Sequence, residues 1–351
     1  MLINYDTLRC NQSCKGKRAR DAAGTMEDEF SFIRSITPKK HNHQITMGIG
    51  DDAARYRPQS GKDQLICTDT MVEGVHFLRE TMSPYAVGWK ALASNLSDIA
   101  AMGGVPDFYL VSAAFSEEWF ADGKEVYRGM ADLANHYHLD LIGGDTVSSP
   151  EAFVLSVTVI GHAPDKRTFL RREAKPGDIL MVTGTLGDSA AGLSILQKKL
   201  SVDKKNMDYL VRRHQLPKPR LDAAELIRRL PCRAALNDIS DGLASESSEI
   251  AEASHVSLVI DRDQLPVSQA LLEIDQEQRL NFILYGGEDY QLLMAVPREA
   301  AEHYRDVFAE NHLLLSPIGE VVDAEGEPGV FLKEADQIRR LTKSGYNHFR
   351  K

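Results

Sequence analysis

Residues 83–104 have the sequence SPYAVGWKALASNLSDIAAMGG. Ser83 and Pro84 predict a helix start, because serine caps the free N–H groups of a first turn and proline suits the first helical position. The apolar residues that follow recur on one face of such a helix: Leu92, Leu96 and Ile99. Asp98 lies beside that apolar face. The segment therefore predicts a helix, followed by two glycines, that can direct a carboxylate inward.

On both sides of this helix, short segments rich in β-branched residues predict strands. In the first half of the chain they lie at residues 44–49, 64–68, 108–114, 139–142 and 153–161, and later at residues 178–184, 234–237, 256–260 and 290–296. Residues 162–177 are polar and basic with two prolines, which predicts a domain boundary. We therefore expect an α/β (α+β) protein with a flexible extension at residues 1–25 and domains at residues 26–163 and 164–351.

The composition restricts the classes of partner. The net charge of −10 argues against nucleic acid, whose phosphates require a basic surface. No apolar run reaches the roughly 18 residues of a membrane-spanning helix, and the first residues, MLINYDTLRC, lack the apolar segment of a secretory signal. The four cysteines are too scattered for a zinc site, so reduced thiols are expected. We therefore expect a cytoplasmic protein that binds neither nucleic acid nor membranes.

Aspartates directly follow several of the predicted strands. They are Asp51 and Asp52 after strand 44–49, Asp69 after strand 64–68, Asp145 after strand 139–142, and Asp238 and Asp241 after strand 234–236. Each has glycine, serine or threonine nearby, residues that permit tight turns and the close approach of a ligand. One such pair is usually only a turn, but four strand ends of this kind in one chain predict a shared site.

Several ionised carboxylates do not converge unpaired, because like charges raise one another's pKa and burying a charge is costly. Magnesium resolves this conflict, since it takes oxygen ligands and typically joins a few carboxylates to substrate phosphates. An acidic protein can bind nucleotides in this way, because metal ions then stand between its carboxylates and the phosphates. The pattern therefore predicts a magnesium site that binds a polyanion.

Other phosphate- and metal-binding motifs are absent from the sequence. The chain has no G-x-x-x-x-G-K-[ST] loop and no protein-kinase catalytic or D-F-G motif. Residues 48–53, GIGDDA, half resemble a dinucleotide fingerprint, but two aspartates there would repel a pyrophosphate without metal. Residues 237–242 place Ile239 where a calcium loop needs an oxygen ligand. A phosphoryl-transfer enzyme without these loops needs another scaffold.

Nine segments together resemble the successive motifs of the thiamine-monophosphate kinase family. They are GIGDDAA (48–54), TDTMVEGVHF (68–77), ALASNLSDIAAMGG (91–104), LIGGDT (141–146), AKPGD (174–178), VTGTLGDSAAGL (182–193), NDISDGL (237–243), GGEDY (286–290) and SGYNHF (344–349). The resemblance is collinear from about Met26 to the C-terminus. The same superfamily includes aminoimidazole ribonucleotide synthetase and selenophosphate synthetase, but GGEDY and SGYNHF favour the thiamine enzymes.

This resemblance implies a two-domain aminoimidazole ribonucleotide synthetase-like fold, in which the sheet of an N-terminal ATP- and magnesium-binding domain pairs with that of a dimer partner. It also implies transfer of the ATP γ-phosphoryl group to thiamine monophosphate. The residues that match magnesium ligands are Asp52, Thr68, Asp69, Asp98, Asp145, Asp238 and Asp241. Those that match ATP contacts are Gly144, Asp145, Arg171 and Ser240. Those that match contacts to thiamine monophosphate are His76, Glu288 and Tyr346.

The chemistry of this reaction suits such residues. The acceptor oxygen of a phosphate monoester is largely ionised near neutrality, because its second pKa is about 6. The reaction therefore requires no strong general base. The obstacle is to bring two polyanions together, so charge neutralisation and alignment are expected to carry the catalysis.

Several of these residues also have structural interpretations. His76 is flanked by apolar residues and is consistent with a histidine at the edge of the core. Arg171 is consistent with a solvated charge in a linker, and Tyr346 with the cover of a small apolar patch. Asp51 competes with Asp52 as the direct metal ligand, and we favour Asp52.

Two further alternatives stay open at this point. The segment at residues 184–192 could bind phosphate at a helix start, but we interpret it as a structural turn because Asp188 would oppose an anion. The function could also be another ATP-dependent reaction of the same superfamily, in its purine or selenium branch, or the chain could be a nucleotide-binding relative without catalysis.

Overall fold

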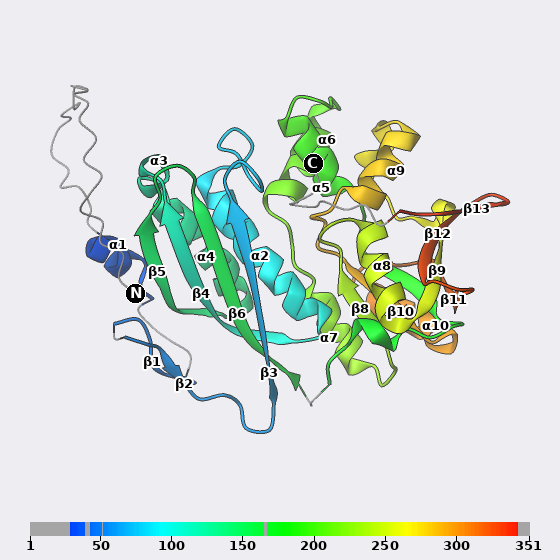
Figure 1. Cartoon of the computed structure of the whole chain (residues 1–351), viewed down its shortest axis with the longest axis horizontal. Helices are drawn as coiled ribbons and strands as arrows, with labels where there is room; N and C mark the ends of the chain where they lie inside the picture. The colour runs from blue at the N-terminus through cyan, green and yellow to red at the C-terminus, as the bar shows by residue number, and fades with distance from the viewer. Residues whose placement is uncertain (1–28, 39–42, 51, 165–166, 343–351) are drawn as a thin grey trace.

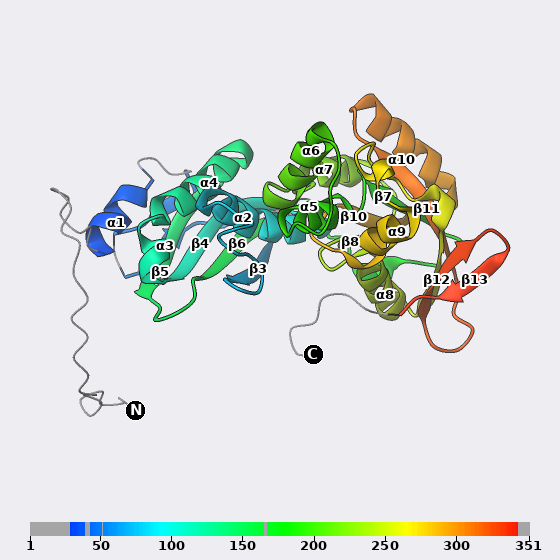
Figure 2. The same cartoon turned by 90° about the horizontal axis from the view of Figure 1, so that it is seen from above.

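The computed structural model describes residues 29–38, 43–50, 52–164 and 167–342. The chain forms two α/β bodies that lie side by side, with a four-stranded sheet in the first and a seven-stranded sheet in the second (Figure 1; Figure 2). This architecture confirms the predicted α/β (α+β) class. The predicted extension at residues 1–25 and Tyr346 lie outside the described residues.

The first sheet has the strand order β3-β6-β4-β5, with β4 and β5 parallel and the other pairs antiparallel. Its strands are β3 (Asp63–Val72), β4 (Val105–Phe115), β5 (Asp140–Ser148) and β6 (Val154–Ala163). The other elements of this body are α1 (Glu29–Ile36), β1 (Ile45–Met47), β2 (Arg55–Tyr56), α2 (Pro84–Ala101), α3 (Glu117–Phe120) and α4 (Gly123–Tyr137). Helices α2 and α4 cover one face, which we call the inner face (Figure 1). On the opposite, open face, Ile66, Thr68, Thr70 and Val147 are exposed.

Helix α2 forms as the sequence predicts, because Ser83 Oγ accepts a hydrogen bond from Ala86 N in its first turn. It lies very close to α4. A Cβ atom on Gly88 would lie 1.8 Å from Val126 O, and one on Gly129 would lie 2.0 Å from a backbone oxygen of α2. Only glycine permits this approach. The contact fixes α2 between the first sheet and the second body.

The second sheet has the strand order β13-β12-β9-β11-β7-β10-β8. Its strands are β7 (Ile179–Thr183), β8 (Ala235–Asp238), β9 (Val256–Asp261), β10 (Leu292–Val296), β11 (Leu315–Asp323), β12 (Gly329–Glu334) and β13 (Gln337–Arg340). Its helices are α5 (Asp188–Leu196), α6 (Lys204–Gln215), α7 (Leu221–Arg229), α8 (Leu243–Ser254), α9 (Gln276–Tyr285) and α10 (Arg298–Glu310), with 3-10 turns η2 (Arg171–Glu173), η3 (Arg262–Gln264) and η4 (Leu271–Glu273). Apolar cores lie on both faces of this sheet.

The two bodies share one of these cores. Leu96 of α2 belongs to the same contiguous apolar cluster as Leu236 of β8, and Trp89 Nε1 of α2 donates a hydrogen bond of 2.8 Å to Pro217 O. Strands β3 to β6 form the first sheet, β1 and β2 pair separately, and strands from residue 179 onward form the second sheet. The division at residue 164 remains our proposal. Helix α2 therefore presents its outward side chains at the domain interface.

The structure corrects two predicted strand ends. Strand β3 continues to Val72, so Asp69 and Thr70 lie within it, and β5 continues to Ser148, so Asp145 lies within that strand. Each strand is paired along most of its length, β3 with β6 and β5 with β4. These ladder bonds outweigh the low strand propensity of aspartate and glycine. Of the other two, β8 ends at Asp238, close to the predicted end, whereas β1 ends at Met47, earlier than predicted.

Two properties predicted from composition can be checked in the described part of the chain. No helix there is both long and apolar enough to cross a membrane. Cys67 and Cys232 are free thiols, as expected. Cys10 and Cys14 lie outside the described residues.

Candidate active site

Three aspartates from different elements converge between the two bodies. Asp69 lies on the inner face of β3, Asp98 lies on α2 and Asp238 ends β8. Asp238 is 4% exposed, and Ser97 Oγ donates a hydrogen bond of 2.6 Å to its Oδ2. Asp69 has a hydrogen bond with the Ser94 side chain. We call Asp69, Asp98 and Asp238 the carboxylate cluster.

The pKa values of the carboxylate cluster show that its members act on one another. Burial, followed by the charges of Asp238 and Asp69, raises the pKa of Asp98 from 3.8 to about 8. Burial raises the pKa of Asp238 to about 6, with a further contribution from Asp69. Burial also raises the pKa of Asp69. Three ionised carboxylates in this position repel one another, so a cation would stabilise them.

Arg171 in η2 partly offsets this negative charge. Its guanidinium acts to lower the pKa values of Asp98 and Asp238. Nε donates a hydrogen bond of 2.9 Å to Asn237 Oδ1, and the guanidinium lies 3.3 Å from the Glu249 carboxylate. The side chain is nevertheless 52% exposed, so a ligand can reach it. These contacts favour a site residue over a solvated linker charge.

The turn that follows β8 is held by a buried acid, Glu246. Its Oε1 accepts hydrogen bonds from Asp241 N at 3.0 Å and from Ser240 Oγ at 3.4 Å. Burial raises the pKa of Glu246 to about 9, so this side chain is protonated near neutrality. The sequence analysis missed Glu246, because a glutamate in the first turn of a helix predicts only a favourable interaction with the helix dipole.

The motifs NDISDG and GGEDY interlock through their backbones. Glu288 N donates a hydrogen bond of 2.7 Å to Ser240 O, and Tyr290 N donates one of 2.9 Å to Ile239 O. Gly287 has φ +67°, and a Cβ atom there would lie 2.4 Å from Ser240 O. Glu288 itself has φ 57°, an uncommon conformation for a residue with a side chain. These bonds fix Glu288 next to the turn that carries the predicted metal and ATP ligands.

Glu288 also forms an ion pair across the domain interface with Lys90 of α2. Lys90 Nζ lies 2.6 Å from Glu288 Oε2, and the side chains are 0% and 29% exposed respectively. Burial acts to raise the pKa of Glu288, but the charge and the hydrogen bond of Lys90 oppose it, and the pKa is lowered. The sequence analysis missed Lys90 and His214. The available signal was a lysine among the small and apolar residues of α2.

His76 follows β3 and lies close enough to Asp69 and Glu288 for its charge to act on the pKa values of both. Its Nδ1 accepts a hydrogen bond of 3.0 Å from Val72 N. In the neutral ring the proton therefore lies on Nε2. The side chain is half-buried at a turn, which favours a site residue over a histidine at the edge of the core.

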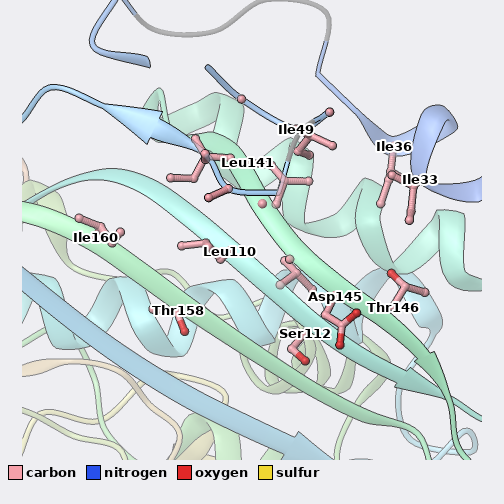
Figure 3. A pocket seen from close by; sticks show the side chains of 18 of the residues that line it. Ile33, Ile36, Ile49, Leu110, Ser112, Leu141, Asp145, Thr146, Thr158 and Ile160 are labelled. Carbon is pink, nitrogen blue, oxygen red and sulfur yellow. The ribbon is translucent and has the colours of Figure 1, made fainter. Parts of the chain in front are cut away.

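Three other predicted residues lie on the open face instead. Asp52, Gly144 and Asp145 line a cavity of about 630 Å³ there (Figure 3). The strand registers place Asp145 in one row with Ser112 and Ser156, and Figure 3 shows Asp145 and Ser112 side by side. The choice between Asp51 and Asp52 as metal ligand is not decided, because residue 51 lies outside the described residues.

Thr68 belongs to the open face as well. Its Oγ1 donates a hydrogen bond of 3.1 Å to Val157 O and accepts one of 3.0 Å from Thr158 Oγ1. Because side chains alternate along a strand, Thr68 and Asp69 point to opposite faces. Strands β3 and β5 are the two edges of the sheet, so Asp69 and Asp145 are also separated by three strand spacings, roughly 14 Å. We call the separate set the open-face group: Asp52, Thr68, Gly144 and Asp145.

The donor atoms of both groups fit magnesium, since they are the hard carboxylate and hydroxyl oxygens that this ion prefers. Within the described ranges, no three His, Cys, Asp or Glu side chains are arranged to hold a metal ion by themselves. Magnesium usually keeps several waters and binds one or two carboxylates together with substrate phosphates. The carboxylate cluster therefore suits an ion whose coordination a phosphate ligand completes.

The segment at residues 184–192 is a structural turn, as predicted. Asp289 accepts hydrogen bonds from Gly187 N at 2.5 Å and from Ser189 N at 3.1 Å at the start of α5. The protein's own carboxylate therefore occupies the position that a phosphate would take at this helix N-terminus.

Known proteins resemble this chain in both domains. Residues 50–163 match the family described as AIR synthase related protein, N-terminal domain, and residues 175–330 match AIR synthase related protein, C-terminal domain. The thiamine-monophosphate kinase of Bacillus subtilis (strain 168) is 46% identical over 327 residues, which cover 92% of this chain and 100% of that protein.

Solved structures agree with these matches. The thiamine-monophosphate kinase of Stenotrophomonas maltophilia K279a has a TM-score of 0.75 and 33% identity, covering 86% of this chain and 94% of that one. AaThiL complexed with AMPPCP and TMP has a TM-score of 0.70 and 33% identity, covering 92% and 97%. The expected resemblance is confirmed: the chain belongs to the thiamine-monophosphate kinase family.

Proposed function

We propose that this enzyme transfers the γ-phosphoryl group of ATP to thiamine monophosphate, giving thiamine diphosphate and ADP. The observation that carries the proposal is the interlock of the two motifs. It brings the turn at Ser240 and Asp241, which follows the carboxylate cluster, next to Glu288. The residues proposed to contact the nucleotide and the residue proposed to contact the acceptor would thereby be neighbours. The family membership and the AaThiL complex with AMPPCP and TMP support the same substrates.

The proposed roles follow the family pattern. Asp52, Thr68, Asp69, Asp98, Asp145, Asp238 and Asp241 would hold magnesium ions, and Gly144, Asp145, Arg171 and Ser240 would contact ATP. His76, Glu288 and Tyr346 would contact thiamine monophosphate. When bound, magnesium would supply positive charge that neutralises the phosphates.

The chain's own residues would align the reactants for in-line transfer. Arg171 is exposed beside the carboxylate cluster, so it can neutralise charge that develops on the transferred group. The protonated Glu246 holds the Ser240 turn without adding another negative charge. His76 can donate from Nε2, because its Nδ1 already accepts a backbone hydrogen bond. No general base is required, since the acceptor phosphate is already ionised.

We further propose that two copies pair through their open faces. Ile66 is 68% exposed and Val147 is 49% exposed on this face, and apolar side chains on a sheet face favour a partner surface. Pairing would also address the separation of the open-face group from the carboxylate cluster, because a second copy can bring its own Asp145 near the edge of this sheet. We therefore propose a homodimer. Because the reaction uses ATP, we propose that this homodimer is cytoplasmic.

The test is incubation of the purified protein with ATP, magnesium and thiamine monophosphate, followed by chromatography. Thiamine diphosphate should form in step with ADP, and unphosphorylated thiamine should not replace thiamine monophosphate as acceptor. Release of ADP without thiamine diphosphate, or equal use of thiamine, would refute the proposed acceptor.

A further inference from the structure

Two buried residues at the domain interface, Lys90 and His214, have no role in the proposed chemistry. Lys90 of α2 and His214 of α6 both approach the carboxylate of Glu288, at 2.6 Å from Nζ and 3.4 Å from Nδ1. Lys90 Nζ also lies 3.5 Å from His214 Nδ1, and Ser189 Oγ lies 3.2 Å from the same nitrogen. These contacts join the first body, through Lys90, to the second.

Both contacts are made to one oxygen of Glu288. Lys90 and His214 approach Oε2, and neither contact uses Oε1. Lys90 is 0% exposed and His214 is 1% exposed, whereas the Glu288 side chain is 29% exposed. Lys90 therefore contacts the carboxylate at Oε2, while part of the Glu288 side chain stays accessible to a ligand.

The chemistry of the three groups fixes their roles. Burial, and then the charge of Lys90, lowers the pKa of His214 to about 3, so the imidazole is neutral. A lysine ammonium can only donate hydrogen bonds, so His214 Nδ1 acts as an acceptor toward Lys90. Lys90 thus has two acceptors, Glu288 and His214, and these two contacts fix the orientation of its ammonium group.

Stability alone is a poor explanation for this lysine. A buried ion pair often contributes no more than well-packed apolar residues of the same volume, because desolvation offsets the attraction. Lys90 is surrounded by the small and apolar residues of α2, where Leu or Met would satisfy the packing. What an apolar residue could not do is hold Glu288 in a fixed orientation.

We infer that Lys90 is a positioning residue, itself oriented by His214, that holds Glu288 so that its carboxylate meets the acceptor substrate. This inference rests on the proposed function. Thiamine monophosphate carries a cationic ring and an amino group, and a fixed carboxylate can attract the first or accept a hydrogen bond from the second. Because Lys90 and Glu288 come from different domains, acceptor recognition depends on the docking of the domains.

The test compares Lys90→Met, Glu288→Gln and the double variant by steady-state kinetics. Lys90→Met should raise the KM for thiamine monophosphate about tenfold while the KM for ATP changes less than about twofold. In the Glu288→Gln background, Lys90→Met should change the KM for thiamine monophosphate by less than about twofold, because the carboxylate charge that Lys90 orients is gone. Lys218→Met is the matched control, since Lys218 forms an exposed ion pair of 2.7 Å with Asp222.

The outcomes separate this inference from the proposed function. An unchanged KM for thiamine monophosphate in Lys90→Met, or the same increase with and without Glu288→Gln, would overturn the positioning role. If Lys90→Met does not fold, His214→Leu is compared in the same two backgrounds and judged by the same criterion. If the wild-type protein makes no thiamine diphosphate, the proposed function fails first and the inference falls with it.

Discussion

The carboxylate cluster and the open-face group carry the same kinds of oxygen atom, but a single chain encloses them to different degrees. The carboxylate cluster is assembled from both bodies, with Asp238 only 4% exposed and hydrogen-bonded to Ser97. The open-face group lies on an exposed sheet surface, where Thr68 and Asp145 are largely accessible. A sequence motif can therefore supply a suitable side chain that, within one chain, lies on an open surface and not in an enclosed site.

The two groups also differ in the electrostatic repulsion among their carboxylates. Carboxylates in the cluster repel one another in a partly buried position, so they store unfavourable energy that a cation removes. Aspartates on the open face are exposed to water and carry little such energy.

Asp238→Asn should lower kcat by about 100-fold or more, because it removes a charged ligand of the magnesium ion that would neutralise the phosphates. The stability of the variant should not fall, since the Asn side chain can still accept the hydrogen bond from Ser97 and one repelling charge is gone. Steady-state kinetics over a range of magnesium concentrations, with a thermal melt, measure both effects. Asp263→Asn, at an exposed carboxylate in η3, is the control. Near-normal turnover of Asp238→Asn would remove it from the proposed site.

Coexpression of Asp238→Asn with Asp145→Asn should restore activity that each variant lacks alone. If the two groups meet across a dimer, half of the randomly assembled dimers are mixed, and each mixed dimer has one intact site of two. Activity should then reach about a quarter of the wild-type value. Purified mixed dimers without activity would show that the two groups are not shared between copies in this way.

Magnesium and a non-hydrolysable ATP analogue should stabilise the protein together far more than either does alone. Mass action predicts about 2–4 kcal/mol at 100 to 1,000 times the dissociation constant. The reason is that phosphates and carboxylates repel one another until a cation lies between them. Thermal-shift titrations with each ligand singly and in combination measure the effect. Equal stabilisation by the nucleotide with and without chelator would exclude a metal bridge.

The smallest expected effect is a pH dependence of the metal-free protein. The folded-state pKa of Asp98 is raised from 3.8 to about 8, so between these values the folded state holds a proton that the unfolded state has released. The proton bound to Asp98 favours the folded state, so the free energy of unfolding falls as the pH rises toward 8 and this proton is released. The wild-type melting temperature should fall by a few degrees more between pH 6 and pH 8 than that of Asp98→Asn. Equal slopes for both proteins would contradict the shift.

The sequence predicts the local parts of this molecule well. Ser83 caps α2 as expected, and Asp98 faces inward from that helix because it lies beside the apolar face. These features depend on neighbours within a turn or two, which propensity and spacing describe.

The sequence does not predict how distant residues share a face or a charge. Thr68 and Asp69 are adjacent in the chain but lie on opposite faces of the sheet, because β3 continues past both residues. Lys90 pairs with Glu288 across 198 positions and with His214 across 124. Such pairs depend on the packing of α2 between two sheets, which a single sequence does not specify.

The central claim is that the carboxylate cluster binds a divalent cation together with nucleotide phosphates. Electron paramagnetic resonance of manganese, added as a substitute for magnesium, measures this binding directly. With AMPPCP present, the wild-type protein should remove the free manganese signal beyond what AMPPCP removes alone, and Asp238→Asn should lose most of that excess. An identical excess for the wild type and Asp238→Asn would contradict the account.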